Sequence, residues 1–484
     1  MSFYPGQDIM RTMRIPDKIA SAKRIHVLGV AGQEGRAVFD YLLSSGLDVV
    51  GHVSVPENGF KETFLSFSDA YEESEARGMA ERFLASGKMV FGENYAKGIS
   101  ENDAVIVPQA YRRLSLNAPV IEMDRDGKII LVQAIELAFA IADCKTVGAT
   151  GTAGKSTVSA IIGNILKSAG VQFYFSGNDR ENKWDFFALE NLPKGGFALF
   201  EISHRHLMDL KQSPNVAVIT NIFPHHLDDA GSYEKYIEIK KNIYRFQNAG
   251  DVAIVNRSLA ESGIVKESGE TEGELVFYAG GTLDVFFGGR EAKVPLSDFK
   301  LSGEHNIQNA NAAMLAGLAC GIPASAVEEG IRSFRGLRYR QELVGEYGGV
   351  RIINDGKSTD PLATIEAVKA VKNIGALILG GVREGFSEGD FIPLGEAIAG
   401  SGVKEVFIFG SSKEDMAKDL SRTGVVPKLC SSLENAVFEA KSAAKGGEAI
   451  VFSPGCQSFD EFRDYRHRAS AFNVAVKKLF GSAA

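Results

Sequence analysis

The stretch at residues 147–157, Val-Gly-Ala-Thr-Gly-Thr-Ala-Gly-Lys-Ser-Thr, constrains the fold of this chain more than any other. An apolar run precedes it and an amphipathic pattern follows at residues 158–169, which predicts a strand, a glycine-rich turn and a helix. Such a turn directs several backbone N–H groups and the positive end of the helix dipole into one small volume, where phosphate oxygens are favoured. We therefore predict a nucleotide site here; the alternative is an ordinary connecting loop rich in glycine and threonine.

The details of the loop extend this prediction. The strict phosphate-loop pattern has glycine where this chain has Ala149, but the Gly-Thr-Xaa-Gly-Lys-Ser core is complete. We expect Lys155 to reach the outer phosphates and the Ser156 hydroxyl to hold the accompanying Mg²⁺. The residues expected to surround the nucleotide are Gly151, Thr152, Gly154, Lys155, Ser156 and Thr157.

Composition limits the class of protein. At 484 residues, with 45% hydrophobic and 24% charged residues, the chain predicts two to four globular domains. The net charge of -8, without a basic block, argues against nucleic acid as a partner. Its four cysteines are widely spaced, no signal peptide begins the chain and no apolar run would span a bilayer. We expect a soluble, cytoplasmic protein that binds no membrane.

The first third of the chain begins as a βαβ unit. Residues 24–29 predict a buried strand, residues 36–45 a helix and residues 47–55 the next strand. The glycines of the intervening turn, Gly29, Gly32 and Gly35, are similar to a dinucleotide fingerprint. Two residues separate the first two glycines instead of one, which disfavours a nicotinamide or flavin site, and a purely structural turn is an open alternative. Further along, residues 68–82 predict a solvated helix and residues 104–108 a buried strand.

The second third places polar residues at strand ends. A strand at 197–203 carries Glu201, and one at 215–223 leads to two adjacent histidines, of which at most one faces a common site. A predicted helix at 232–247 carries Lys240, for which a solvated basic face is the alternative. On a later helix, Asn306 and Asn309 share one face; they could read an adenine edge, or Asn306 could cap the helix.

The last third again alternates strands with helices. Strands are predicted at 349–355, 376–381, 406–410 and 449–453, and Pro361 opens a helix at 362–371. The fold class predicted is α/β with three domains. These are a Rossmann-like N-terminal domain at 1–142, a central P-loop ATPase domain at 143–337 and a Rossmann-like C-terminal domain at 338–484.

Taken together, the motifs resemble the Mur ligase family, the ATP-dependent enzymes that build the peptidoglycan stem peptide. The match runs in order over roughly the last two-thirds of the chain. It rests on the loop at 148–157 (with Ala153 where asparagine is common) and on the motifs at 201–203, 226–228, 236–240, 303–309, 334–337, 353–359 and 453–460, with Phe472. Within the family, the resemblance is closest to the members that add D-glutamate to UDP-N-acetylmuramoyl-L-alanine.

The resemblance implies a mechanism and a set of site residues. An acceptor carboxylate would be phosphorylated by ATP to an acyl phosphate, which the amino group of the amino acid would then attack. Lys155, His226 and Lys240 would be catalytic, and Mg²⁺ would be held by Ser156, Glu201, His226 and Lys240, the last as a carbamate. Asn306, Asn309, Arg340 and Asp355 would contact ATP. The expected partners are a UDP-linked muramoyl precursor, an amino acid and ATP, and the expected state is a monomer.

The amino-acid side departs from the family in one place. Lys357, Thr359, Ser458, Phe459 and Tyr465 would surround the incoming amino acid. A lysine that helps hold the acidic amino acid in the D-glutamate-adding members falls on or next to Glu384 here, so we expect Arg383 to supply the positive charge.

The acceptor side departs further. Residues 203–206, Ser-His-Arg-His, replace the usual Ser-Ser-Phe-Gln where the muramoyl peptide is expected to bind. Elsewhere, near the end of the chain, Arg468-Ala469 replaces a common Arg-Gly pair, which is a milder change. Residues 107–110 replace a Ser-Pro-Gly turn in the domain expected to bind UDP. Several alternatives stay open: a ligase for L-glutamate or another amino acid, a ligase for a non-peptidoglycan carboxylate, a nicotinamide oxidoreductase, or a P-loop switch protein without ligase chemistry.

Overall fold

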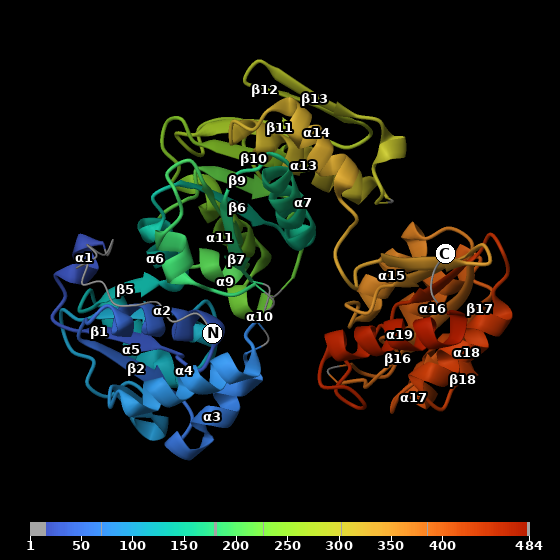
Figure 1. The fold of residues 1–484 in the computed structure, drawn as a ribbon, viewed down its shortest axis with the longest axis horizontal. Coiled ribbons are helices and arrows are strands. Elements are labelled where there is room, and N and C mark those ends of the chain that lie inside the picture. Colours follow the sequence, from blue (N-terminus) through green and yellow to red (C-terminus); the bar gives the residue numbers. More distant parts are fainter. Residues whose placement is uncertain are drawn as a thin grey trace. The chain divides into compact units, whose positions relative to one another are not determined.

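The protein is described here by a computed structural model that covers residues 16–68, 70–178, 182–225, 227–301, 303–384 and 386–481. The chain forms two compact units (Figure 1). The first comprises the chain up to Phe299 together with Glu304–Phe334, and the second comprises Lys300–Gly303 and the chain from Arg335 onward. Each unit is described separately below.

The first unit begins with a five-stranded parallel sheet in the order β3-β2-β1-β4-β5. The strands β1 and β4 are buried along their whole length, which explains why they are continuous apolar runs rather than alternating ones. The strands are β1 (Ile25–Leu28), β2 (Val49–Val53), β3 (Met89–Phe91), β4 (Ala104–Val107) and β5 (Ile130–Gln133). The helices are α1 (Asp17–Ala20), α2 (Gln33–Ser44), α3 (Glu57–Ser66), α4 (Glu73–Ala85), α5 (Ala118–Arg125) and α6 (Ala134–Ile141).

A six-stranded parallel sheet, ordered β11-β10-β9-β6-β8-β7, forms the rest of the first unit with a two-stranded antiparallel ribbon, β12-β13. The sheet strands are β6 (Lys145–Thr150), β7 (Phe173–Gly177), β8 (Phe197–Glu201), β9 (Val216–Ile219), β10 (Val252–Asn256) and β11 (Glu274–Tyr278), and the ribbon strands are β12 (Leu283–Phe287) and β13 (Arg290–Val294). The helices are α7 (Lys155–Ser168), α8 (Phe186–Glu190), α9 (His204–Leu207), α10 (Leu227–Ala230), α11 (Tyr233–Arg245), α12 (Arg257–Glu261), α13 (Glu304–Ala319) and α14 (Ala324–Ser333).

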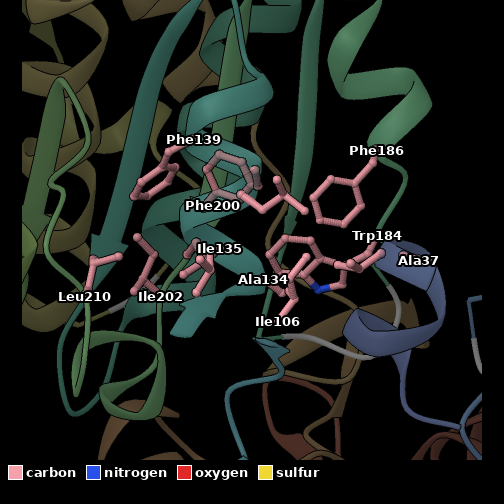
Figure 2. Close-up of a cluster of buried hydrophobic side chains, with 14 of the residues drawn as sticks. Ala37, Ile106, Ala134, Ile135, Phe139, Trp184, Phe186, Phe200, Ile202 and Leu210 are labelled. Carbon is pink, nitrogen blue, oxygen red and sulfur yellow. The ribbon is translucent and has the colours of Figure 1, made fainter. Parts of the chain in front are cut away.

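One apolar cluster joins the two sheets of the first unit (Figure 2). It includes Ala37 of α2 and Ile135 of α6 from one side, and Phe200 of β8 from the other. Trp184 is almost fully buried in this cluster and stacks on Phe186 with ring centroids 6.0 Å apart. Because large apolar side chains from both sheets share one core, the first unit is held as a single body.

The second unit contains a six-stranded sheet in the order β14-β15-β19-β16-β17-β18, in which only β14 runs antiparallel to its neighbour. Its strands are β14 (Glu342–Tyr347), β15 (Val350–Asn354), β16 (Ile374–Gly380), β17 (Glu405–Phe409), β18 (Lys428–Leu429) and β19 (Ala449–Phe452). The helices are α15 (Pro361–Ala370), α16 (Ile392–Ser401), α17 (Lys413–Ser421), α18 (Leu433–Ala443) and α19 (Tyr465–Phe480). Asp360 caps α15 by accepting a hydrogen bond from the Ala363 N–H at 2.9 Å, and Pro361 occupies its first position.

The predicted fold class is confirmed: the chain is α/β, with three doubly wound, mostly parallel sheets in sequence order. The exact domain limits at residues 142 and 337 stay a prediction. The solvated helix predicted at 68–82 corresponds to α4, which begins only at Glu73. Most of its residues are exposed, but Ala76, Met79 and Phe83 form a buried apolar face. In the described part of the chain, no helix has both the length and the apolar character needed to cross a membrane.

Candidate active site

The predicted phosphate loop lies between β6 and α7, at the centre of the second sheet. Gly154 precedes α7 in the left-handed region, with φ +86°, and a Cβ there would lie 2.6 Å from Asn309 Oδ1. At Gly151 a Cβ would lie 1.8 Å from the Thr220 hydroxyl oxygen. Both positions therefore require glycine for steric reasons, and α13 contributes Asn309 directly against the loop.

Two residues that follow β9 hold the loop in shape. Thr152 N–H donates to the Asn221 carbonyl at 2.9 Å, and Ala153 N–H donates to the Asn221 side-chain oxygen at 2.8 Å. The Thr220 hydroxyl donates to the Ala153 carbonyl at 2.5 Å. Thr220 and Asn221 were not among the predicted site residues. Their position at the carboxyl end of a strand next to β6 is the signal that would have indicated them.

Lys155 opens α7 and turns back onto its own loop. Its Nζ donates to the carbonyls of Gly151 at 2.9 Å and Thr152 at 3.0 Å. Ser156 and Thr157 follow in the first turn of α7, at the positive end of the helix dipole. The amine thus contacts the loop itself.

Glu201 ends β8, directly beside the strand that leads into the loop: it pairs in register with Ala149. Its carboxylate is buried, with 2% of the residue exposed. Oε1 accepts a hydrogen bond from Asn178 at 3.3 Å, whereas Oε2 is buried and has no hydrogen-bond partner in the described structure. A buried carboxylate oxygen without a donor is costly, and a cation at this point would satisfy it.

Lys240 projects from α11 into the same region and is fully buried. Its Nζ donates to the Thr150 hydroxyl at 2.9 Å and to the Gly151 carbonyl at 3.0 Å. Burial, together with the nearby positive charge of Lys155, lowers the pKa of Lys240 well below its usual range, and Glu201 only partly opposes this. The alternative of a solvated basic face is therefore wrong for Lys240, and its amine is poised to be neutral.

The remaining predicted residues of the first unit are only partly placed. His226 lies outside the described residues. Among those described, no three His, Cys, Asp or Glu side chains gather closely enough to bind a metal by themselves. Asn306 is the third residue of α13, so the alternative that it caps this helix is wrong. Asn309, one turn further, contacts the loop at Gly154.

The segment that departs from the family pattern, Ser-His-Arg-His at 203–206, joins the two sheets of the first unit. His206 is fully buried and its Nε2 lies 3.2 Å from Glu34 Oε1, at the start of α2. The other oxygen of Glu34 accepts the Gln109 N–H at 2.8 Å, and the Ser203 hydroxyl donates to the Gln109 side-chain oxygen at 2.6 Å. These contacts form a polar junction between α2, α9 and the loop after β4.

The second unit holds the other predicted ATP contacts. Tyr339 and Gln341 both have left-handed backbones, with φ +61° and +48°, and they flank Arg340. Asp355, at the end of β15, accepts hydrogen bonds from Gln341 N–H at 3.0 Å and from the hydroxyls of Ser358 at 2.6 Å and Ser453 at 2.7 Å. Burial raises the pKa of Asp355 to about 6 against these donors.

The predicted amino-acid residues lie in the same unit, in loops that follow strands, except Tyr465, which begins α19. The Lys357 amine lies 5.5 Å from the centroid of the Tyr465 ring, so these two are brought together. Thr359 lies two residues beyond Lys357 and is half-buried. Ser458 is buried, whereas Phe459 beside it is 60% exposed.

Arg383 is already engaged inside the protein. Its Nη2 lies 3.0 Å from Asp419 Oδ2, in an ion pair whose side chains are 13% and 0% exposed, and it also donates to the Ser387 carbonyl. Glu384 is exposed. Of the six residues predicted to bind the amino acid, Arg383 therefore has the least support from the geometry.

The glycine loop, the helix dipole behind it and the lysine that covers it define a P-loop nucleotide-binding protein with an α/β fold. The family described as the Mur ligase middle domain matches residues 149–317, which include this loop. A UDP-N-acetylmuramoylalanine--D-glutamate ligase from Geotalea daltonii is 31% identical over 95% of this chain and 98% of the relative. Another from Acidobacterium capsulatum is 32% identical over 76% of this chain and 82% of the relative.

Solved structures share the fold. The UDP-N-acetylmuramate-alanine ligase MurC from Thermotoga maritima aligns with a TM-score of 0.54 at 18% identity, covering 94% of this chain and 99% of that one. The MurF ligase from the same organism, solved in complex with ADP, aligns with a TM-score of 0.51 at 17% identity over 79% and 97% of the two chains. The chain belongs to the Mur ligase family, and the predicted resemblance to the D-glutamate-adding members is confirmed.

Proposed function

We propose that this protein is an ATP-dependent ligase that adds D-glutamate to UDP-N-acetylmuramoyl-L-alanine in peptidoglycan synthesis. The observation that carries the proposal is the convergence of Lys240, Lys155 and Glu201 on one glycine loop, in a chain similar over nearly its full length to D-glutamate ligases. The substrates are three small molecules: the UDP-linked acceptor, the amino acid and ATP.

In the first half-reaction the acceptor carboxylate attacks the γ-phosphate of ATP, and ADP leaves. Little covalent chemistry is asked of the protein in such a step, which depends on positioning and on neutralising charge. The loop N–H groups and the start of α7 cradle the phosphates, Lys155 swings from the Gly151 carbonyl to the outer phosphates, and Asn309 packs against the loop at Gly154. Arg340 and Asp355, on the second unit, are proposed to complete the ATP contacts.

A Mg²⁺ site fits the residues on one side of the loop. Glu201 Oε2 is a buried oxygen that lacks a hydrogen-bond donor, and Ser156 offers a hydroxyl in the first turn of α7. His226 is proposed to join them. When bound, Mg²⁺ would neutralise phosphate charge that develops during transfer.

Lys240 is proposed to carry a carbamate. A carbamate forms when a neutral amine attacks CO₂ and loses one proton, and the buried, low-pKa amine of Lys240 is suited to that reaction. The modification would place an anionic group next to the Lys155 ammonium, so that the two side chains attract each other. A carbamate would also provide the oxygen ligands that a magnesium site requires.

In the second half-reaction the amino group of D-glutamate attacks the acyl phosphate, and phosphate leaves through a tetrahedral intermediate. Lys357, Thr359, Ser458, Phe459 and Tyr465 are proposed to hold the amino acid, with Arg383 as the predicted but least supported sixth contact. The Rossmann-like N-terminal domain is proposed to bind the UDP moiety, beside the Ser203–Gln109 junction.

The test is a phosphate-release assay with the purified protein, ATP and Mg²⁺. We expect release only when UDP-N-acetylmuramoyl-L-alanine and D-glutamate are both present. Release with L-glutamate but not D-glutamate would overturn the assigned amino acid, and release that needs no acceptor would overturn the ligase function. The same plate tests other D- and L-amino acids against each acceptor.

A further inference from the structure

Arg468 is a fully buried arginine in the first turn of α19. Its Nη1 donates to the Gly380 carbonyl at 3.0 Å and to the Gln457 carbonyl at 2.9 Å. Gly380 is the last residue of β16 and Gln457 lies in the loop after β19, so one guanidinium nitrogen links the end of a strand to the neighbouring loop. This role involves only Nη1 of the guanidinium group.

The opposite edge of the same guanidinium has no acceptor. Nε and Nη2 are both buried, and neither has a hydrogen-bond partner among the residues that the structure describes. The N–H bonds of Nε and Nη2 lie in the guanidinium plane and point in nearly the same direction. This pair of donors is the one that binds the two oxygens of a carboxylate. Burial lowers the pKa of Arg468 to about 10, a measure of how poorly this cation is compensated.

Among the described residues, no carboxylate forms a hydrogen bond with this edge. Asp460, whose charge acts on Arg468, accepts the Ser411 N–H at 2.9 Å through Oδ2, and its Oδ1 is buried without a hydrogen-bond partner in the described structure. Arg383 and Asp419 are paired with each other. Burial raises the pKa of the Cys456 thiol to about 12, so this neighbour is neutral. An uncompensated buried cation is expensive, which implies that an anion completes the site in another state of the protein.

Arg468 lies beside the carboxyl ends of two neighbouring strands, and this position favours a ligand as that anion. The strands β16 and β19 are neighbours, and the chain runs from β16 outward through β17 and β18 before β19 returns between β15 and β16. This is the topological switch point, and open α/β sheets bind ligands there, beyond the carboxyl ends of the strands. The loop after β19 also carries Ser458 and the exposed Phe459.

We propose that the Nε–Nη2 edge of Arg468 binds one carboxylate of the incoming acidic amino acid. Arg468 would then supply the positive charge that is lost where Glu384 stands on or next to the family's lysine position, and that Arg383, paired with Asp419, does not replace. The proposal rests on the proposed function, because it requires that the amino acid binds in this unit. Since Arg468 has no exposed surface in this structure, the loop at 457–460 yields when the amino acid enters.

The test compares wild type with Arg468→Lys, which keeps the charge and removes the fork, using steady-state kinetics with three amino acids. D-glutamate has both carboxylates, D-glutamine lacks the γ-carboxylate and D-isoglutamine lacks the α-carboxylate. We expect the KM for D-glutamate to rise at least about tenfold in the variant, with KM for ATP and acceptor unchanged. For the analogue that lacks the carboxylate bound by Arg468, the ratio of the variant's KM to the wild-type KM should fall toward one. Arg463→Lys, at a residue whose side chain is 83% exposed, is the matched control and should leave all values unchanged.

An equal effect of Arg468→Lys on all three amino acids would overturn the proposal, because a structural role does not discriminate between them. Should the variant fail to fold, a crystal structure of the wild-type protein with the amidated product decides. A product carboxylate about 3 Å from Nε and Nη2 supports the proposal, and Asp460 or water on that edge overturns it. If wild type forms no amide with any acidic amino acid, the proposed function itself fails, and the assignment of Arg468 fails with it.

Discussion

The Lys240 amine donates to the Gly151 carbonyl at 3.0 Å, and the Lys155 amine donates to the same carbonyl at 2.9 Å. Two lysines therefore converge on one carbonyl oxygen of the nucleotide loop. Two ammonium groups so close together repel each other, and burial penalises the charge of Lys240 further. The arrangement is stable when Lys240 is neutral, and it becomes attractive when Lys240 carries an anionic carbamate.

Replacing Lys240 by alanine should abolish amide formation. If the carbamate is what matters, added formate or acetate should restore part of the activity, because a small carboxylate can occupy the emptied space. Lys241→Ala is the control, since Lys241 is held by Glu270 at 2.9 Å away from the loop, and it should keep near-normal rates. A Lys240→Ala enzyme with normal product yield would refute the role of this residue.

Substitution of Gly154 by alanine should weaken ATP binding by at least about tenfold. The new methyl would lie 2.6 Å from Asn309 Oδ1, at a φ of +86° that alanine rarely adopts. Gly163→Ala on the same helix is the control: its nearest neighbour would be Phe173 at 3.5 Å, an ordinary contact. That change should keep ATP affinity and stabilise the fold slightly, by about 0.5 kcal/mol. Calorimetric titration with ATP measures the affinity. An ATP affinity of the Gly154→Ala protein equal to that of wild type would contradict the loop geometry.

The Glu34–His206 pair should contribute far more to the free energy of unfolding than an exposed ion pair on a surface helix of the same unit. Glu34→Ala leaves His206 Nε2 and the Gln109 N–H without their hydrogen-bond partner, which costs about 2–4 kcal/mol for the two groups together. Arg77→Ala breaks an exposed pair with Glu73, whose side chains are 57% and 74% exposed, and should cost less than about 1 kcal/mol. Urea unfolding followed by Trp184 fluorescence compares the two variants. Similar unfolding midpoints for Glu34→Ala and Arg77→Ala would contradict the stabilising role of the buried pair.

Much of the architecture could be predicted from the sequence, because it depends on local patterns. The βαβ start, the loop at 147–157 and the strand ends at Glu201 and Asp355 follow from apolar runs, glycines and neighbouring polar residues, and all lie where expected. The fourth helix was misplaced because a dense run of charges concealed its buried apolar face, which includes Phe83.

Contacts between distant residues could not be predicted in the same way. No sequence pattern brings His26 within 2.8 Å of His52 on the neighbouring strand, pairs Arg383 with Asp419, or leaves one edge of Arg468 open. Each depends on strand order and on loops that meet only after folding. The burial of Lys240 could not be predicted either, since a Lys-Lys pair on an amphipathic helix is equally typical of a solvated face.

The buried histidines of the first sheet predict a pH dependence of stability. His52 donates its Nδ1–H to the Tyr95 carbonyl at 2.5 Å and contacts His26 through its other ring nitrogen. His26 Nε2 in turn lies 3.2 Å from Asp103 Oδ2. Burial lowers the pKa of His52 to about 4. The unfolded chain takes up a proton below about pH 6.5 and the folded one does not, so stability is lost as pH falls through that window, by up to about 3 kcal/mol near pH 4. His52→Asn removes this titration, and its unfolding free energy should vary less between about pH 7 and pH 5 than that of wild type. Equal slopes for the two proteins would contradict the assignment.

The central claim is that ATP activates the acceptor carboxylate for attack by D-glutamate. The most direct measurement uses UDP-N-acetylmuramoyl-L-alanine with a heavy-oxygen-labelled carboxylate and follows both products by mass spectrometry. The account predicts one amide product per ADP, carrying one glutamate, and the transfer of a single labelled oxygen into inorganic phosphate. Formation of ADP without the amide, or of unlabelled phosphate with it, would contradict the account.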